Sequence, residues 1–261
     1  MSKYLIFGGR SYLGSEFKKY LDKNNIINQA IESNNSENYS YSKILEILHI
    51  YEPTKIVDFK FIKVSSNDSD FKNLKEKDIF QPQKNLIQSI NKSEINLSHL
   101  VYISTAGPNL NIYTSLKRKQ EKIYKKYLDN NEILSILKLN TVFGPGDINK
   151  TRLIPFFFSK ILDDRCIELN IHSNKNGNFI FINDAIEEIF NFSENLAFET
   201  HVFTIKYKKL IQTVSYITKV LFDFDHKVIW NDRELPSLNV IENDKLFDYL
   251  YTTTEWYLRR N

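Results

Sequence analysis

The sequence lacks the features that mark disulfide-stapled, secreted or membrane-spanning chains. It contains a single cysteine, Cys166, which excludes an internal disulfide and fits a reducing compartment. No run of about 18 apolar residues is present, so no membrane-spanning helix is expected. No basic, apolar leader precedes the first predicted strand. We therefore expect a cytoplasmic protein with neither a signal peptide nor a membrane anchor.

Concentrated charge, metal-ligand spacing and internal repeats are also missing. The formal net charge is +3, and the lysine and glutamate residues are dispersed along the chain. This pattern favours a solvated surface over a nucleic-acid-binding face. The five histidines do not have the spacing of metal ligands, so no metal is expected. With 261 residues, 42% of them hydrophobic, the chain can form one large α/β domain and a smaller lobe.

A glycine-rich turn follows the first apolar run, residues 3–7, and precedes a helix predicted over residues 15–22. Strand, turn and helix N-terminus together can hold a diphosphate, because the backbone amides and the positive end of the helix face the ligand. Ser11 stands where a Gly-x-x-Gly-x-x-Gly loop has its middle glycine, and an ordinary strand-to-helix turn is the alternative. The candidate cofactor-binding residues of the turn are Gly8, Gly9, Arg10, Ser11, Tyr12, Leu13 and Gly14.

Charged residues after the first three strands bear on the choice of cofactor. A second strand, residues 26–31, is followed by Glu32, near the place of the acid that binds an adenosine ribose in dinucleotide folds. Glu32 favours NAD because a carboxylate repels a 2′-phosphate, whereas Arg10 favours NADP by pairing with that phosphate. Either residue can instead be a solvated surface charge. Lys60, at the end of a third strand over residues 55–61, is a further cofactor-binding candidate, and the alternative is a snorkelling surface lysine.

The candidate catalytic residues lie in the stretch 101–117. A buried strand ends in the hydroxyl pair Ser104 and Thr105, a short loop follows, and a helix that opens with Tyr113 is predicted to run to about residue 129. Tyr113 and Lys117 are four residues apart, so both side chains fall on one helix face. A hydroxyl, a phenol and an ammonium at the carboxyl end of a strand can form a proton-transfer site.

The Tyr-x-x-x-Lys spacing alone does not identify this stretch, because it occurs twice elsewhere. One copy, Tyr51 with Lys55, straddles Pro53 and cannot be a single helical turn. The other, Tyr39 with Lys43, lies on a predicted helix that no hydroxyl-ended strand precedes. The context therefore selects Tyr113.

Alternation of strands and helices predicts an α/β fold with a Rossmann-type, doubly wound parallel sheet and its ligand at the carboxyl ends of the strands. The turn over residues 141–147 marks a domain boundary. We expect a dinucleotide-binding domain of residues 1–146 plus about 184–206. A small C-terminal substrate-binding lobe should comprise residues 147–183 plus 207–261. Its elements are short, so we expect no independent core, although the phenylalanines at 156–158 should be buried there.

Five motifs in this order resemble the extended short-chain dehydrogenase/reductases, which act largely on nucleotide-linked sugars. The motifs are GGRSYLG, YIST, YTSLK, VFGPGD and FIFINDA, and they span nearly the whole chain. The resemblance implies a nicotinamide cofactor and a catalytic set of Thr105, Tyr113 and Lys117, with Lys117 also holding the nicotinamide ribose. A surface Tyr and Lys beside a structural Thr is the alternative.

Departures from the family pattern bear on the substrate. Thr105 and Tyr113 are only eight positions apart, a short loop that resembles compact reductases of nucleotide-linked 4-keto-6-deoxysugars. Ala106 and the glycine after it replace the Asp-Glu pair of dehydratases. Gly177-Asn178 stands where an Arg-Asp pair often binds the substrate diphosphate, and Arg233 lies at the place of another such arginine. The resemblance thus makes Thr105, Ala106, Thr141 and Arg233 the candidate substrate-binding residues.

The sequence therefore predicts an NAD(P)H-dependent reductase of a keto group on a nucleotide-linked sugar. A reductase favours NADPH, while Glu32 argues for NAD. One alternative is a nucleotide-sugar epimerase that retains NAD; another is a non-catalytic NAD(P)-binding regulator, against which the presence of Thr105, Tyr113 and Lys117 argues. The resemblance further implies surface-polysaccharide synthesis and a homodimer formed through helices that include the Tyr113 helix. No nucleic-acid or membrane partner is expected.

Overall fold

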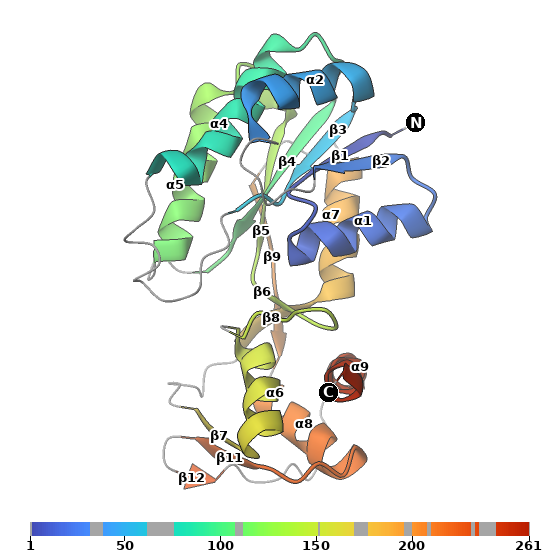
Figure 1. The fold of residues 1–261 in the computed structure, drawn as a ribbon, viewed down its shortest axis with the longest axis vertical. Helices are drawn as coiled ribbons and strands as arrows, with labels where there is room; N and C mark the ends of the chain where they lie inside the picture. Colours follow the sequence, from blue (N-terminus) through green and yellow to red (C-terminus); the bar gives the residue numbers. More distant parts are fainter. Residues whose placement is uncertain are drawn as a thin grey trace. The chain divides into compact units, whose positions relative to one another are not determined.

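The computed structural model describes residues 2–31, 39–61, 76–107, 112–150, 152–169, 177–195, 200–207, 210–230, 233–234 and 244–260. The chain divides into two compact units (Figure 1). The first, here called the sheet unit, consists of Met1–Asn140 and Asn183–Phe203. The second, the lobe unit, consists of Thr141–Ile182 and Thr204–Asn261.

The sheet unit is built on six parallel strands in the order β2-β1-β3-β4-β5-β9. The chain passes from β1 to β2 on one side and then crosses to β3 on the other, so the strand order reverses between β1 and β3. This reversal is the switch point at which open α/β sheets bind ligands, and it confirms the predicted doubly wound fold. The strands are β1 (Tyr4–Phe7), β2 (Asn28–Ile31), β3 (Lys55–Asp58), β4 (His99–Thr105), β5 (Leu134–Leu139) and β9 (Thr200–Phe203).

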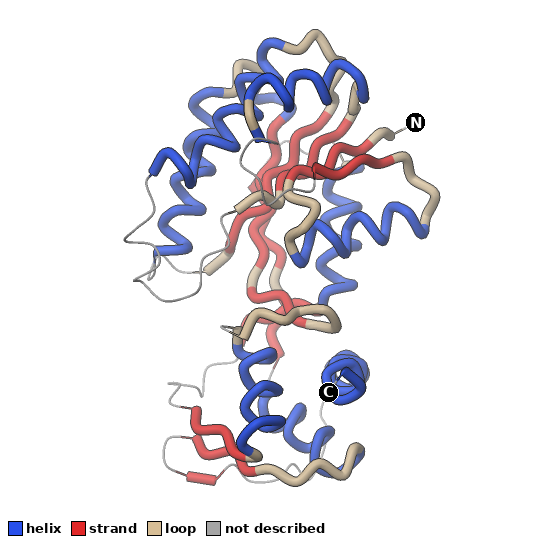
Figure 2. Tube along the Cα trace, viewed as in Figure 1, coloured by secondary structure: helices blue, strands red, loops and turns tan. Residues whose placement is uncertain are grey.

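Helices cover both faces of this sheet (Figure 2). Leu5 and Phe7 of β1 belong to an apolar cluster with residues of α2, α4 and α5. Tyr4 points to the opposite face, where its ring contacts Phe17 of α1 and Phe190 of α7. This alternation follows from the two-residue period of a strand and explains why the strands read as continuous apolar runs. The helices are α1 (Tyr12–Lys23), α2 (Tyr41–Tyr51), α4 (Glu76–Lys92), α5 (Ile112–Tyr127) and α7 (Ile182–Glu194), with a 3₁₀ turn, η2 (Asn131–Ile133).

Two local predictions in the sheet unit are corrected. The helix predicted from residue 15 begins at Tyr12, because the hydroxyl of Ser11 caps it by accepting a hydrogen bond from Gly14 N. Tyr39 and Lys43 do not share a helix, since α2 begins at Tyr41 after a Ser40 cap. The ring of Tyr39 is buried instead, and its hydroxyl donates to the backbone oxygen of Ile31.

The lobe unit contains two three-stranded sheets, β10-β8-β6 and β12-β11-β7. The turn over residues 141–147 was predicted as a boundary, and its first three residues form the strand β6, which pairs with β8. The strands are β6 (Thr141–Phe143), β7 (Cys166–Leu169), β8 (Gly177–Phe181), β10 (Ile205–Tyr207), β11 (Lys227–Trp230) and β12 (Arg233–Glu234). The helices are α6 (Leu153–Asp164), α8 (Leu210–Tyr216), the π-helical η3 (Ile217–Leu221) and α9 (Asp244–Arg260).

The lobe unit has a core of its own, contrary to expectation. Of the three phenylalanines predicted to be buried, Phe157 and Phe158 of α6 are fully buried, whereas Phe156 is half-buried. Val214 of α8 and Leu250 of α9 are fully buried as well. The ring of Phe158 stacks on that of Tyr257, with centroids 4.3 Å apart. The short elements bury a core because α6, α8 and α9 each contribute large apolar side chains. In the described part of the chain, no helix combines the length and the apolar sequence that crossing a bilayer requires.

Candidate active site

The glycine turn at the carboxyl end of β1 is fixed by its own backbone. Gly9 N donates to the Ile31 oxygen over 3.3 Å, and Ser11 N donates to the Gly8 oxygen over 3.0 Å. Gly8 has a φ of +89°, and a Cβ there would lie 2.7 Å from Lys60 N. Glycine is therefore required at position 8, where the turn approaches the backbone that follows β3 at the switch point.

The start of α1 completes this turn. A Cβ on Gly14 would lie 2.5 Å from the Gly8 oxygen, so no side chain fits between helix and turn. The Ser11 hydroxyl is directed back to Gly14 N, at 3.0 Å. The first backbone amides of an α-helix point out of its N-terminal end, and the first turn of α1 follows the glycine turn directly. These donors and the positive helix end suit an anion, and the geometry fits the diphosphate of a dinucleotide.

The charged cofactor candidates are placed differently. Arg10 is exposed in the turn, whereas Glu32 lies outside the described residues. Lys60 is half-buried, and its Nζ lies 4.3 Å from the centroid of the buried Tyr39 ring. Burial lowers the pKa of Lys60, against which the charge of Asp58 acts. A half-buried lysine whose ammonium lies over an aromatic ring fits both interpretations, a cofactor contact and a snorkelling lysine, so Lys60 stays a candidate.

Tyr113 and Lys117 meet around one aromatic ring. Tyr113, at the start of α5, is 40% exposed and contacts the Phe61 ring edge-on, with centroids 4.9 Å apart. Lys117 is 4% exposed, and its Nζ lies 4.8 Å from the centroid of the same ring. The Lys117 ammonium also donates to the oxygen of Ile103 in β4, over 3.0 Å. That carbonyl is two residues before Thr105, so the strand end and the helix face predicted to form the site lie together.

Thr105 is half-buried at the end of β4, and two residues of the connection to α5, Ala106 and Gly107, are described after it. The hydroxyl of Thr105 accepts a hydrogen bond from Gly107 N at 3.3 Å. Ala106 N donates to the Leu139 oxygen of β5 at 2.9 Å. A Cβ on Gly107 would lie 3.3 Å from Cγ2 of Thr114, so Gly107 lies close to the first turn of α5.

A buried carboxylate beneath this site was not predicted. Asp58, at the end of β3, is fully buried, and its Oδ2 accepts a hydrogen bond from the Tyr124 hydroxyl at 2.5 Å. Its Oδ1 accepts from Lys60 N at 2.6 Å. Burial raises the pKa of Asp58 to about 6, although Tyr124 and Lys117 act in the opposite direction. An aspartate inside the apolar run KIVDF is the sequence signal that could have revealed it.

A second charged cluster, also missed, joins α5 to the strands. Glu121 receives hydrogen bonds from the Ser104 hydroxyl at 2.5 Å and from Arg118 Nη1 at 2.7 Å. Lys138 Nζ of β5 lies 3.0 Å from its other oxygen. Burial raises the pKa of Glu121, but the hydrogen bonds from these three side chains outweigh it and hold the pKa below its usual range. Lys138 in the apolar run ILSILKL was the available signal.

The remaining substrate-binding candidates lie in the lobe unit. Thr141 is the exposed first residue of β6, and Arg233 lies in β12, paired with Trp230 of β11. The cluster around Lys117 is formed entirely by residues of the sheet unit.

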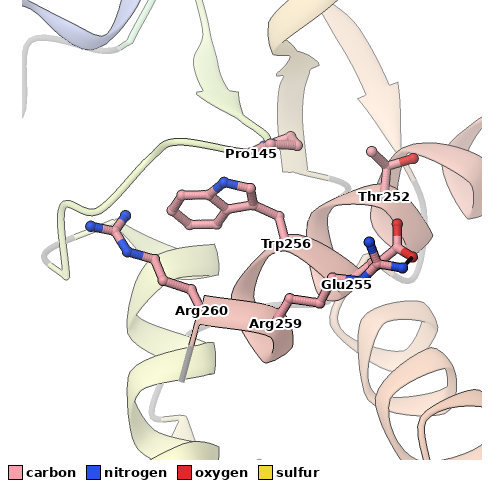
Figure 3. A pocket seen from close by; sticks show the side chains of 6 residues that line it. All are labelled: Pro145, Thr252, Glu255, Trp256, Arg259 and Arg260. Carbon is pink, nitrogen blue, oxygen red and sulfur yellow. Dashed lines mark ion pairs between the residues drawn. The ribbon is translucent and has the colours of Figure 1, made fainter.

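The lobe unit also contains an open pocket that includes none of the predicted site residues (Figure 3). Arg259 Nη2 is paired with Glu255 at 2.5 Å, and Arg260 lies 5.1 Å from the centroid of the Trp256 ring. Both arginines are thus engaged by neighbours on α9. Among the residues that the structure describes, no group of histidine, cysteine, aspartate and glutamate side chains could hold a metal ion.

No protein-family model matches the sequence, and no curated protein does. Solved structures do match. A UDP-glucuronic acid 4-epimerase from Bacillus cereus in complex with NAD has a TM-score of 0.75 at 17% identity, covering 98% of this chain and 96% of that chain. A UDP-glucose 4-epimerase from Thermotoga maritima with UDP-glucose has a TM-score of 0.73 at 14% identity, covering 99% of both chains.

RMD from Pseudomonas aeruginosa, complexed with NADPH, has a TM-score of 0.71 at 12% identity and covers 99% of this chain and 98% of that chain. At such identities the likeness concerns the fold, and it extends over nearly the full length of each chain. The chain therefore has the fold of the extended short-chain dehydrogenase/reductases, the family that its sequence motifs resemble.

Proposed function

We propose that this chain is an NAD(P)-dependent oxidoreductase that reduces a keto group on a nucleotide-linked sugar. The observation that carries the proposal is the meeting of Tyr113 and Lys117 around Phe61, with Lys117 bound to the strand that ends in Thr105. In a parallel sheet the carboxyl ends of β1 and β4 lie at the same edge, so the glycine turn and the catalytic set serve one site.

The residues that would hold the cofactor are those of the glycine turn, with Arg10 and Lys60 as the charged contacts. The nicotinamide supplies the hydride. The similar structures include one in complex with NAD and one complexed with NADPH, so both cofactors occur on this fold. For a reductase we favour NADPH, with Arg10 pairing with the 2′-phosphate. If Arg10→Ala binds NADPH as tightly as the wild type, Arg10 does not pair with the 2′-phosphate. We would then favour NAD as the cofactor, with Glu32 as the residue that selects it.

Tyr113 is the proton donor to the substrate oxygen. A free tyrosine has a pKa near roughly 10 and is a poor acid at neutral pH unless a positive charge stabilises its phenolate. Lys117 provides that charge from the next turn of the same helix. Burial lowers the pKa of Lys117 to about 8, so the ammonium is still charged at neutral pH. Thr105 donates a hydrogen bond to the same substrate oxygen and orients it.

The short connection from Thr105 to α5 supports a compact ketoreductase acting on a 4-keto-6-deoxysugar. Ala106 and Gly107 offer no carboxylate for the proton removal that dehydration needs. Thr141 and Arg233 are our candidates for binding the sugar and its diphosphate. We further propose a cytoplasmic enzyme of surface-polysaccharide synthesis that forms a homodimer through helices including α5.

A nucleotide-sugar epimerase is the second candidate, because two of the similar structures are sugar-nucleotide epimerases. The two activities differ in cofactor balance. A reductase consumes one NAD(P)H for each sugar, whereas an epimerase keeps its NAD bound and shows no net oxidation.

The test is turnover of CDP-, dTDP-, GDP- and UDP-linked 4-keto-6-deoxysugars, followed by the loss of NAD(P)H absorbance. Tyr113→Phe should reduce the rate by roughly 10² to 10⁴, the contribution of a positioned general acid. The matched control is Tyr127→Phe, which removes an exposed phenol from the other end of α5 and should keep the wild-type rate. The proposal fails if no sugar in the panel is reduced, or if Tyr113→Phe retains the full rate.

A further inference from the structure

Asp58 is a buried carboxylate whose hydrogen-bond partners carry no charge. It has no exposed surface, and it accepts hydrogen bonds from the Tyr124 hydroxyl at 2.5 Å and from the Lys60 backbone amide at 2.6 Å. Neither donor neutralises the carboxylate. A buried charge without a counter-charge is costly, so a cation is needed nearby.

Lys117 is a buried cation whose hydrogen-bond partner carries no full negative charge. Its ammonium is buried, donates to one carbonyl, that of Ile103, and is flanked by the rings of Phe61 and Tyr102 at 4.8 and 5.0 Å. Ring faces and a carbonyl dipole do not carry the full negative charge that an ammonium in this position requires. The burial that lowers the pKa of Lys117 is opposed first by the charge of Asp58 and then by that of Glu121.

Glu121 is the weaker candidate for the counter-ion because other cations already satisfy it. Arg118 and Lys138 lie 2.7 and 3.0 Å from its two oxygens.

Asp58 has no ion pair within 4 Å among the described residues. In the sheet Asp58 is paired with Tyr102 of β4, the Lys117 ammonium lies 5.0 Å from the centroid of the Tyr102 ring, and the next residue, Ile103, accepts its hydrogen bond. The buried carboxylate and the buried ammonium therefore lie against the same segment of β4, and the charge of Lys117 acts on Asp58. The charge of Lys60 also acts on Asp58, but Lys60 is only half-buried and its ammonium lies over an aromatic ring. The buried cation for which the described residues hold no other carboxylate partner is Lys117, so charge balance matches Asp58 with Lys117.

We propose that Asp58, fixed in place by Tyr124, is the counter-ion that keeps the Lys117 ammonium charged beside Tyr113. Asp58 is a positioning residue that acts on the reaction through Lys117. This inference rests on the proposed function in so far as it assigns Lys117 a role in catalysis, while the pairing itself is independent of any substrate. The titratable groups that face the pair from β3, β4, β5 and α5 are Lys60, Tyr102, Tyr113, Arg118, Glu121, Tyr124 and Lys138.

The direct readout is the protonation of Lys117 in the substrate-free protein. In protein labelled with ¹⁵N-lysine, the Nζ shift of Lys117, assigned by its loss in Lys117→Met, is followed against pH. Asp58→Asn should lower the pKa of Lys117 by at least one unit, because burial then acts on the ammonium without its main opposing charge. Tyr124→Phe removes the hydrogen bond from Tyr124 to Asp58 but keeps the carboxylate, so it should shift the pKa of Lys117 much less.

Equal shifts in Asp58→Asn and Tyr124→Phe would overturn the proposal, because they would reflect a loosened core rather than a lost charge. An unchanged Lys117 pKa in Asp58→Asn would overturn it too. If Asp58→Asn does not fold, the same titration is carried out on the wild-type protein alone. The Nζ shift of Lys117 should then show a second step near pH 6, where Asp58 takes up its proton. A single step would contradict the pairing.

Activity then separates this inference from the proposed function. In a working reductase, the alkaline limb of the kcat profile should move to lower pH in Asp58→Asn by the same amount as the Lys117 pKa, with KM little changed. Coupled shifts in the NMR titration without any turnover would support the pairing and refute the reductase. Turnover that depends on Tyr113 without a Lys117 shift would support the reductase and refute the pairing.

Discussion

Replacing Lys117 with methionine should remove a pH dependence of stability that the wild-type protein has at alkaline pH. Lys117 is 4% exposed, and burial, opposed by the charges of Asp58 and Glu121, lowers its pKa from 10.5 to about 8. Below about pH 8 both the folded and the unfolded chain hold this proton, so the full cost of burying the charge is present. Between about pH 8 and 10.5 only the unfolded chain holds it, so the free energy of unfolding rises with pH.

The size of the effect follows from the two pKa values. A lowering of about 2.5 units at 1.36 kcal/mol per unit gives roughly 3 kcal/mol over the whole range. Because each titration is spread over about two pH units, roughly 2 kcal/mol of this should be recovered between about pH 8 and 10. Methionine has a similar length and no charge, so Lys117→Met lacks this contribution.

Urea denaturation of both proteins at several pH values between about 7 and 10 measures the effect. The quantity of interest is the unfolding free energy of the wild type minus that of Lys117→Met, which should increase by roughly 2 kcal/mol from about pH 8 to 10. Tyrosines that Lys117 does not influence titrate alike in both proteins and cancel. Tyr113, whose phenolate Lys117 is proposed to stabilise, is replaced by phenylalanine in every protein compared. Lys23→Met, at the exposed end of α1, is the control and should stay parallel to the wild type. A constant difference for Lys117→Met would refute the reasoning that Lys117 is buried as a charged group.

Three further substitutions test the turn and the lobe unit. Ser11→Ala should lower the unfolding free energy by about 1 kcal/mol through loss of the helix cap, and Ser11→Gly by only a few tenths, as measured in urea; equal losses would contradict the capping role. Gly14→Ala should cost about 1–3 kcal/mol, because the new Cβ meets the Gly8 oxygen, and should weaken NAD(P) binding in a fluorescence titration. Phe158→Ala should cost about 3–5 kcal/mol by emptying the lobe core, and a thermal transition unchanged by it would show that this core does not stabilise the unit.

The parts of the fold and site that the sequence predicted are those encoded locally. Apolar runs ending at Phe7 and Thr105, the glycine turn and the four-residue spacing of Tyr113 and Lys117 each depend on neighbours within a few positions. They therefore indicated the parallel sheet and the two helix residues that meet around one ring. The cap by Ser11 was equally local, and the helix start at Tyr12 could have been predicted from the preference of serine for the N-cap.

What was missed depends on contacts distant in sequence. Asp58 meets Tyr124 and acts on Lys117 only because β3 pairs with β4 and α5 packs against both. Phe61 contacts Tyr113 for the same reason. No spacing rule connects these residues. A charged residue inside an apolar strand signals a buried partner without saying which one, and Asp58 gave that signal.

The most direct test of the proposed reaction is the fate of the hydride. With NAD(P)H deuterated at the transferable position and a nucleotide-linked 4-keto-6-deoxysugar, deuterium should appear on the sugar carbon that gains the hydroxyl. One NAD(P)⁺ should form for each product, and Tyr113→Phe should slow the transfer while Tyr127→Phe does not. Deuterium that stays on the cofactor with every sugar of the panel, or transfer at the wild-type rate in Tyr113→Phe, would contradict the proposed reduction.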